Sequence, residues 1–229
     1  MKRPHRNRAL PPLETMRLLL IDHGRCDHDH TRVHHCRADL GRLGIDAAVC
    51  GPSSTPQLEM QHDGMYGIHL HSIAAASNRF LAAVQDGSAE SLLGVVPSLS
   101  PRLLGLVRET ARQLIAEAVD ATDPDVIFVM HAGILTDLAV ETGAPVVVHV
   151  AETDLAVAAS KPLMRTLVGR AIGSSEAVIA ADAAAAESLR TGWMEEHDDT
   201  EPLEIWPLGP TCAEQIASAC RTALAHRRG

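Results

Sequence analysis

Short apolar runs alternate with longer amphipathic stretches along this chain. Two of the apolar runs, residues 126–130 and 146–150, are rich in β-branched side chains, and each follows a turn signal that contains proline. Between them, residues 133–142 are expected to form a short helix, because apolar side chains recur there at helical spacing. A strand, a helix and a strand separated by so few residues make a βαβ unit, whose two strands are parallel.

The same patterns predict the other elements. Strands are expected at 17–22, 45–50, 66–73, 177–181 and 203–208, and helices at about 30–43, 103–119, 162–171, 183–191 and 213–226. Residues 51–57 are expected to be a loop, and 74–100 to be weakly helical around a loop near 85–88. Strands that are apolar on both faces and alternate with helices belong to a covered parallel sheet. The predicted fold class is therefore α/β, a single doubly wound, mainly parallel, Rossmann-like sheet with helices on both faces.

The chain is expected to contain one domain with two short additions. Residues 1–15 are basic and contain proline, so a disordered tail is predicted there, and residues 16–210 form the Rossmann-like domain. Residues 211–229 are expected to be an amphipathic helix that packs on the same domain. A length of 229 residues with 46% hydrophobic residues is enough for a full core.

Charge and cysteine content narrow the class of protein. The net charge is −9 and no basic stripe is present, so nucleic-acid binding is disfavoured. The five cysteines are odd in number and form no CxxC pair, which indicates a reduced, cytoplasmic protein. No apolar stretch has the length of a signal peptide core or a transmembrane segment, so neither is expected.

Polar residues follow three of the predicted strands. In open α/β sheets, ligands bind outside the carboxyl ends of the strands, so these residues are candidates for a binding site. The alternative is that they are loop residues that satisfy backbone groups at the strand ends. The candidates are His23, Gly24, Arg25, His131, Gly133, Glu152 and Asp154.

A second group of candidates lies between residues 26 and 36, where cysteine and histidine are dense. His28, His30 and His34 could hold a metal such as Zn²⁺, Ni²⁺ or Cu²⁺, since His30 and His34 are spaced i, i+4 on the predicted helix. No CxxC or HExxH spacing occurs, so no metal is expected. The alternative is that these histidines lie on a helix surface exposed to water. The sequence also lacks GxSxG, P-loop and GxGxxG motifs, which disfavours a hydrolase, a P-loop enzyme or a dinucleotide-binding enzyme.

Several strings, taken in order, resemble the N-terminal, acceptor-side domain of retaining GT-B glycosyltransferases. They are RLLLIDHG, RLGIDAAVCGP, the long string PDVIFVMHAGILTDLAVETGAPVVVHVAETDL, SSEAVIAADAAAAESLR and LEIWPLGP. The resemblance covers residues 17–210. It implies a half of a GT-B fold that binds a sugar or phosphorylated acceptor, with hexosyl transfer as the activity of the complete enzyme.

The chain also departs from that family's pattern. The loop after the first strand contains Gly24 alone, and the family's cleft His-Gly pair falls on Ala151 and Glu152. The family's second domain, which binds the nucleotide-sugar donor and supplies a glutamate pair, is expected to be absent from this chain. A transferase would then need a partner chain that supplies the donor domain, and a homodimer is the other expected assembly. The alternatives are an inactive binding module on the same scaffold and a histidine-rich metal-binding protein.

Overall fold

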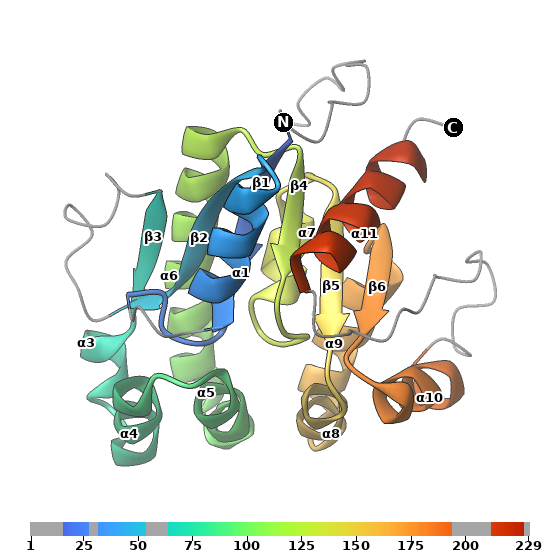
Figure 1. Ribbon diagram of the computed structural model, residues 1–229. Helices are drawn as coiled ribbons and strands as arrows, with labels where there is room; N and C mark the ends of the chain where they lie inside the picture. Colours follow the sequence, from blue (N-terminus) through green and yellow to red (C-terminus); the bar gives the residue numbers. More distant parts are fainter. Residues whose placement is uncertain (1–15, 28–31, 54–63, 194–211, 227–229) are drawn as a thin grey trace.

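Six parallel strands form the centre of the structure, a computed structural model that describes residues 16–27, 32–53, 64–193 and 212–226 (Figure 1). The strands are β1 (Arg17–Ile21), β2 (Asp46–Ser53), β3 (Met65–His69), β4 (Val126–Val129), β5 (Val146–Val150) and β6 (Ala177–Ala180). Their order is β3-β2-β1-β4-β5-β6, and every pair is parallel. The chain therefore reverses its direction of sheet growth between β1 and β4, as in doubly wound folds.

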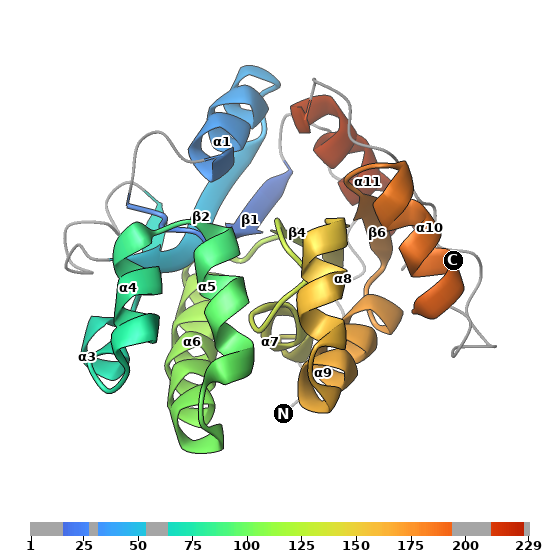
Figure 2. The same cartoon turned by 90° about the horizontal axis from the view of Figure 1, so that it is seen from below.

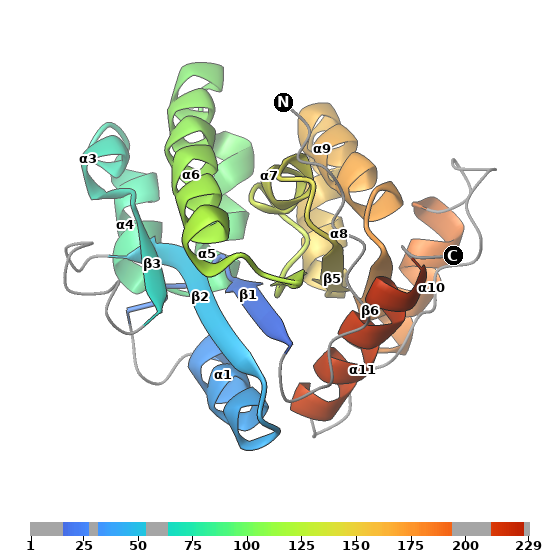
Figure 3. The same ribbon diagram turned by 90° about the horizontal axis from the view of Figure 1, so that it is seen from above.

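Helices cover both faces of this sheet. Figure 3 shows α6 (Pro101–Thr122), α7 (Thr136–Glu141) and α9 (Pro162–Gly173) on one face, and α1 (Arg32–Arg42) and α11 (Cys212–His226) on the other. Shorter helices gather at the end to which the strands point (Figure 1). They are α3 (His71–Ala74), α4 (Asn78–Asp86), α5 (Ala89–Val95), the 3₁₀ helix η3 (Val96–Ser98), α8 (Glu152–Ala159) and α10 (Ala183–Gly192). The predicted doubly wound α/β fold is confirmed.

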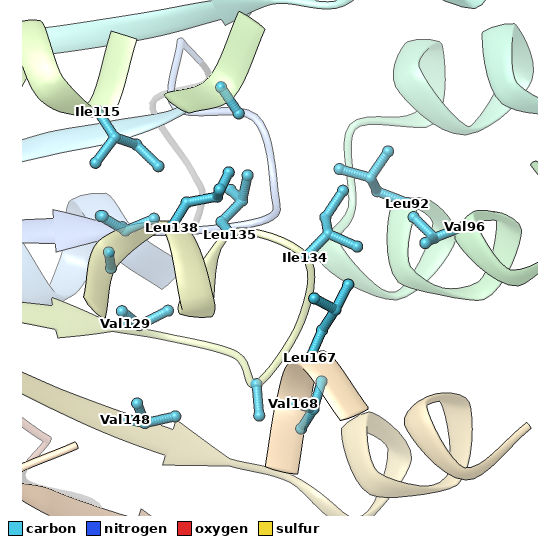
Figure 4. Close-up of a cluster of buried hydrophobic side chains, with 14 of the residues drawn as sticks. Leu92, Val96, Ile115, Val129, Ile134, Leu135, Leu138, Val148, Leu167 and Val168 are labelled. Atoms are coloured by element: carbon cyan, nitrogen blue, oxygen red, sulfur yellow. The ribbon is translucent and has the colours of Figure 1, made fainter. Parts of the chain in front are cut away.

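The sheet separates two apolar cores. Alternate residues of each strand point to opposite faces, so Val146 and Val148 of β5 join one core while Val147 joins the other. The larger core extends beyond the strand ends. In Figure 4, Ile134 in the loop after β4 lies between Leu92 of α5 and Leu167 of α9. This loop carries the candidate residues His131 and Gly133, and the apolar packing fixes its position.

Most predicted elements are present, and several of them differ from the prediction in their bounds or content. The expected loop at 51–57 is wrong at its start, because β2 continues to Ser53 and pairs with β3. The expected strand 66–73 ends at His69, since the chain turns into α3 at His71. In α6, the buried apolar face includes Leu104, whereas Leu106 is 50% exposed. The stretch 74–100 contains two well-formed helices, and Gly87 links them with a φ of 79°.

Residues 152–159 form a helix that the sequence did not predict. The strand-end residues Glu152 and Asp154 belong to this helix, α8, which begins directly after β5. The predicted tail 1–15 and strand 203–208 lie outside the described residues. Among the described residues, no helix has the length and apolar content needed to cross a bilayer.

Candidate functional site

The loops after β1 and β4 and the start of α8 meet where the strand order reverses. Figure 2 looks at this edge of the sheet from below and shows the β4 loop between α5 and α8. Five buried polar residues come from these two loops, from the end of β5 and from the first turn of α8: Asp22, His23, His131, His149 and Asp154. Their separation in sequence spans more than a hundred residues, so only the sheet topology brings them together.

His131 and Asp154 form the central pair of this cluster. His131 Nδ1 lies 3.2 Å from Asp154 Oδ1, and Asp154 is 2% exposed. The second carboxylate oxygen, Oδ2, accepts hydrogen bonds from the backbone N–H groups of Ala132 at 3.1 Å and Ala151 at 3.0 Å. Asp154 is the third residue of α8, where a carboxylate commonly accepts from the backbone at the helix start. One side chain thus fixes both the helix and the imidazole.

The electrostatics of this pair favour a strong base. Burial lowers the pKa of His131, but the hydrogen bond to Asp154 and the charges of Asp154, Asp22 and Glu90 outweigh burial, so the pKa is raised above 6.5. Burial raises the pKa of Asp154, but its hydrogen bond to His131 and the backbone N–H groups lower it overall. Asp154 is therefore ionised and accepts the His131 Nδ1–H, which leaves Nε2 as the titrating atom.

A second carboxylate faces that atom. Asp22 Oδ1 lies 4.0 Å from His131 Nε2, too far for a direct hydrogen bond. The same oxygen accepts the Gly24 N–H at 3.1 Å, so the carboxylate is held in place by the loop that follows β1. His131 therefore lies between two buried carboxylates, bonded to one and separated from the other.

Two further histidines flank His131 and are neutral. The ring centroids of His23 and His149 lie 6.3 Å and 6.4 Å from that of His131. His23 Nε2 accepts the Leu135 N–H at 3.2 Å, so its proton is on Nδ1. His149 Nδ1 lies 2.8 Å from the Met130 carbonyl and donates to it, so its Nε2 carries no proton. Burial lowers the pKa of His23 to about 3 and that of His149 to about 4.

The β4 loop that carries His131 is tightly held. Thr136 Oγ1 donates to the His131 carbonyl at 3.0 Å and accepts the Gly133 N–H at 2.8 Å. A Cβ on Gly133 would lie only 2.4 Å from Leu93 Cδ2 and 2.5 Å from His23 Nε2, so a larger residue would force these side chains to shift. Gly133 therefore has a packing function in this loop.

An ion pair anchors the same loop to α6. The Arg108 guanidinium forms two hydrogen bonds to Asp137, at 2.8 Å and 2.6 Å, and donates to the Ile134 carbonyl at 3.2 Å. Both side chains are largely buried. This bidentate geometry fixes the start of α7 relative to the sheet.

The other sequence candidates lie around this cluster. Gly24 is buried beside Asp22, while Glu152 is exposed at the start of α8. Arg25 forms a bidentate pair with Asp27, at 2.9 Å and 3.2 Å.

Of the metal candidates, His34 Nε2 lies 2.6 Å from the Cys26 carbonyl. His28 and His30 lie outside the described residues. Within 16–27, 32–53, 64–193 and 212–226, no group of three or more His, Cys, Asp or Glu side chains could hold a metal ion.

Asp22 and His149 were not predicted as site residues. Both were assigned to strands, because Asp22 ends the apolar string RLLLID and His149 is enclosed by four valines in VVVHV. A polar residue inside a strand that is otherwise fully apolar is the signal that could have identified His149.

The similarity of this chain to known proteins is found among solved structures. No protein-family model matches it, and no curated protein sequence is similar to it. Among solved structures it is similar to the glycosyltransferase SsfS6 of Streptomyces sp. SF2575, with 12% identity and a TM-score of 0.40 over 72% of this chain and 50% of that one. It is also similar to a UDP-N-acetylglucosamine 2-epimerase, with 13% identity and a TM-score of 0.45 over 86% of this chain and 49% of that one.

A third similar structure is the glycosyltransferase SnogD from Streptomyces nogalater, with 15% identity and a TM-score of 0.42 over 85% of this chain and 50% of that one. The chain thus spans about half the length of these solved structures. At these values the similarity concerns the fold, and we assign no residue role from it.

Proposed function

We propose that this chain is a glycosyltransferase-like domain, and that the His131–Asp154 pair lies at its acceptor site. The observation that supports the proposal is a buried imidazole bonded to an ionised carboxylate at the point where the strand order reverses. In this arrangement the carboxylate fixes the tautomer and orientation of the ring, and the far nitrogen is free to accept a proton.

In the proposed reaction, His131 acts on the acceptor hydroxyl. Nε2 takes the hydroxyl proton while the acceptor oxygen forms a bond to the anomeric carbon of a sugar, and the bond from that carbon to the leaving nucleoside diphosphate breaks. Asp154 stabilises the imidazolium that results. A nucleotide-sugar donor would be held by another domain or a partner chain, as the resemblance to GT-B glycosyltransferases implies.

A catalytically inactive binding module is the second candidate. The observation that favours it is the shielding of the pair, since the His131 side chain is only 10% exposed and that of Asp154 only 1%. A module of this kind would keep the pair as a structural link between α8 and the β4 loop.

A transfer screen distinguishes the two functions. The full chain is incubated with nucleotide-sugars and hydroxylated acceptors, alone and with the product of any adjacent gene. The His131→Asn variant is expected to lower the transfer rate by about 100-fold or more, because a general base contributes that much. His35→Asn, which replaces an exposed histidine on α1, is the control and is expected to retain the wild-type rate. Transfer that survives the loss of His131 would contradict the assigned role, and a lack of binding and turnover in both settings would favour the inactive module.

A further inference from the structure

Negative charge dominates the surroundings of His131. Asp22 from the end of β1 and Asp154 from α8 are both buried beside it, and the charge of Glu90 on α5 also acts on it. The positive group that faces the cluster from α1 is Arg32, whose charge acts on His149. His23 and His149 are neutral, and Arg25 is paired with Asp27. Among the described residues whose charges act on this cluster and are not paired elsewhere, three carboxylates thus face one arginine and one histidine.

The geometry around Nε2 demands a hydrogen-bond donor. With His131 in the neutral form that a base requires, Nε2 and Asp22 Oδ1 are two acceptors that face each other across 4.0 Å. Two atoms at this separation can each lie about 2.8 Å from a third atom. An ammonium group placed there can donate to both acceptors, whereas a hydroxyl can donate to one of them. A phosphate dianion has no proton to donate and would be repelled by both carboxylates.

Two buried histidine nitrogens in the same cluster have unused hydrogen-bonding capacity. Among the described residues, His23 Nδ1 and His149 Nε2 have no hydrogen-bond partner, although both residues are only 1% exposed. Unsatisfied buried groups are rare in native structures. The first is a donor and the second an acceptor, so a group with both donors and lone pairs, such as a hydroxyl, matches them.

We infer that the site takes an acceptor without negative charge, a neutral or amino-bearing hydroxyl compound whose hydroxyl or amino group lies between His131 Nε2 and Asp22. The inference rests on the proposed function and narrows it, because the sequence left sugar and phosphorylated acceptors open. It assigns Asp22 as a specificity-determining residue.

The test uses three probes that share one ring and differ in charge. D-Glucose, D-glucosamine and D-glucose 6-phosphate are titrated into the full chain with isotope-labelled histidine, and the His131 ring signals are followed by NMR. Glucosamine is expected to bind about tenfold or more tightly than glucose 6-phosphate, because a unit charge near a buried carboxylate changes the affinity by at least that much. The Asp22→Asn variant is expected to reduce this preference about tenfold by the same reasoning.

Two other variants keep the test informative if Asp22→Asn does not fold. Glu90→Gln changes an exposed side chain on α5 and is expected to reduce the preference in the same direction. Asp46→Asn removes the same charge at the amino end of β2, the end of the sheet away from the site. This variant is expected to leave the preference for glucosamine unchanged. If glucose 6-phosphate binds as tightly as glucosamine, the inference is wrong, but the proposal that His131 lies at an acceptor site still holds. If none of the three sugars moves the His131 signals, the acceptor site itself fails and the inference with it.

Discussion

Acidification from pH 7 to pH 4.5 is expected to lower the free energy of unfolding by on the order of 3–5 kcal/mol. Burial holds the pKa of His23 near 3 and that of His149 near 4 in the folded state, whereas both rise to the ordinary value of about 6.5 on unfolding. The unfolded chain therefore binds more protons below that value, and stability falls as the pH falls. Urea unfolding at a series of pH values measures this slope.

The other charged groups of the cluster do not cause this loss. His131 has a raised pKa, so its contribution is fully present below pH 6.5 and is lost only as the pH rises through the folded value. Asp154 has a lowered pKa, so its contribution is lost only below its ordinary value of 3.8. In a His149→Gln variant the loss between pH 6.5 and pH 4.5 is expected to be about half of that in the wild type. An unchanged slope in this variant would show that His149 is not held neutral.

Replacement of Arg108 by methionine is expected to cost about 3–5 kcal/mol of stability, because the Asp137 carboxylate would stay buried without its charged partner. The same change removes the bond to the Ile134 carbonyl, so the β4 loop loses its anchor to α6. The measurement is the free energy of unfolding in urea at neutral pH. A double variant, Arg108→Met with Asp137→Leu, is expected to recover most of the loss, since no uncompensated charge remains.

A matched control lies four residues further along α6. Arg112 pairs with Glu141 of α7 at 2.9 Å, but these side chains are 41% and 47% exposed. Arg112→Met is therefore expected to cost less than about 1 kcal/mol. Equal losses for Arg108→Met and Arg112→Met would show that burial does not decide the strength of these two pairs.

The elements that could be predicted from the sequence are those with a clear pattern of apolar residues within the element itself. Strands β1, β4, β5 and β6 are apolar apart from Arg17 at the start of β1 and His149 in β5, and α6 repeats its apolar residues at helical spacing, so these elements were identified directly. The end of β2 was missed because Gly51 and Pro52 are usual loop residues. Here the Pro52 carbonyl accepts the Cys26 N–H from the loop after β1, a contact that only the folded chain provides.

The candidate site was predicted in part. His131 and Asp154 were selected because they follow strands, and the structure brings them together. That Asp154 lies in the first turn of α8 could not be predicted, since 151–154 contains no usual cap residue at position 151 and the capping carboxylate comes three residues later. Asp22 was missed because it ends an apolar string and was assigned to the strand, and His149 was missed because valines lie on both sides of it in sequence.

The central claim is that Asp154 makes His131 a stronger base, and a pH titration of the His131 ring by NMR tests it most directly. In the full wild-type chain, the pKa of His131 is expected to lie above 6.5. In the Asp154→Asn variant it is expected to be lower than in the wild type by about one pH unit or more, because the ring then loses its charged partner but stays buried. A wild-type value below 6.5, or the same value in both proteins, would contradict the account.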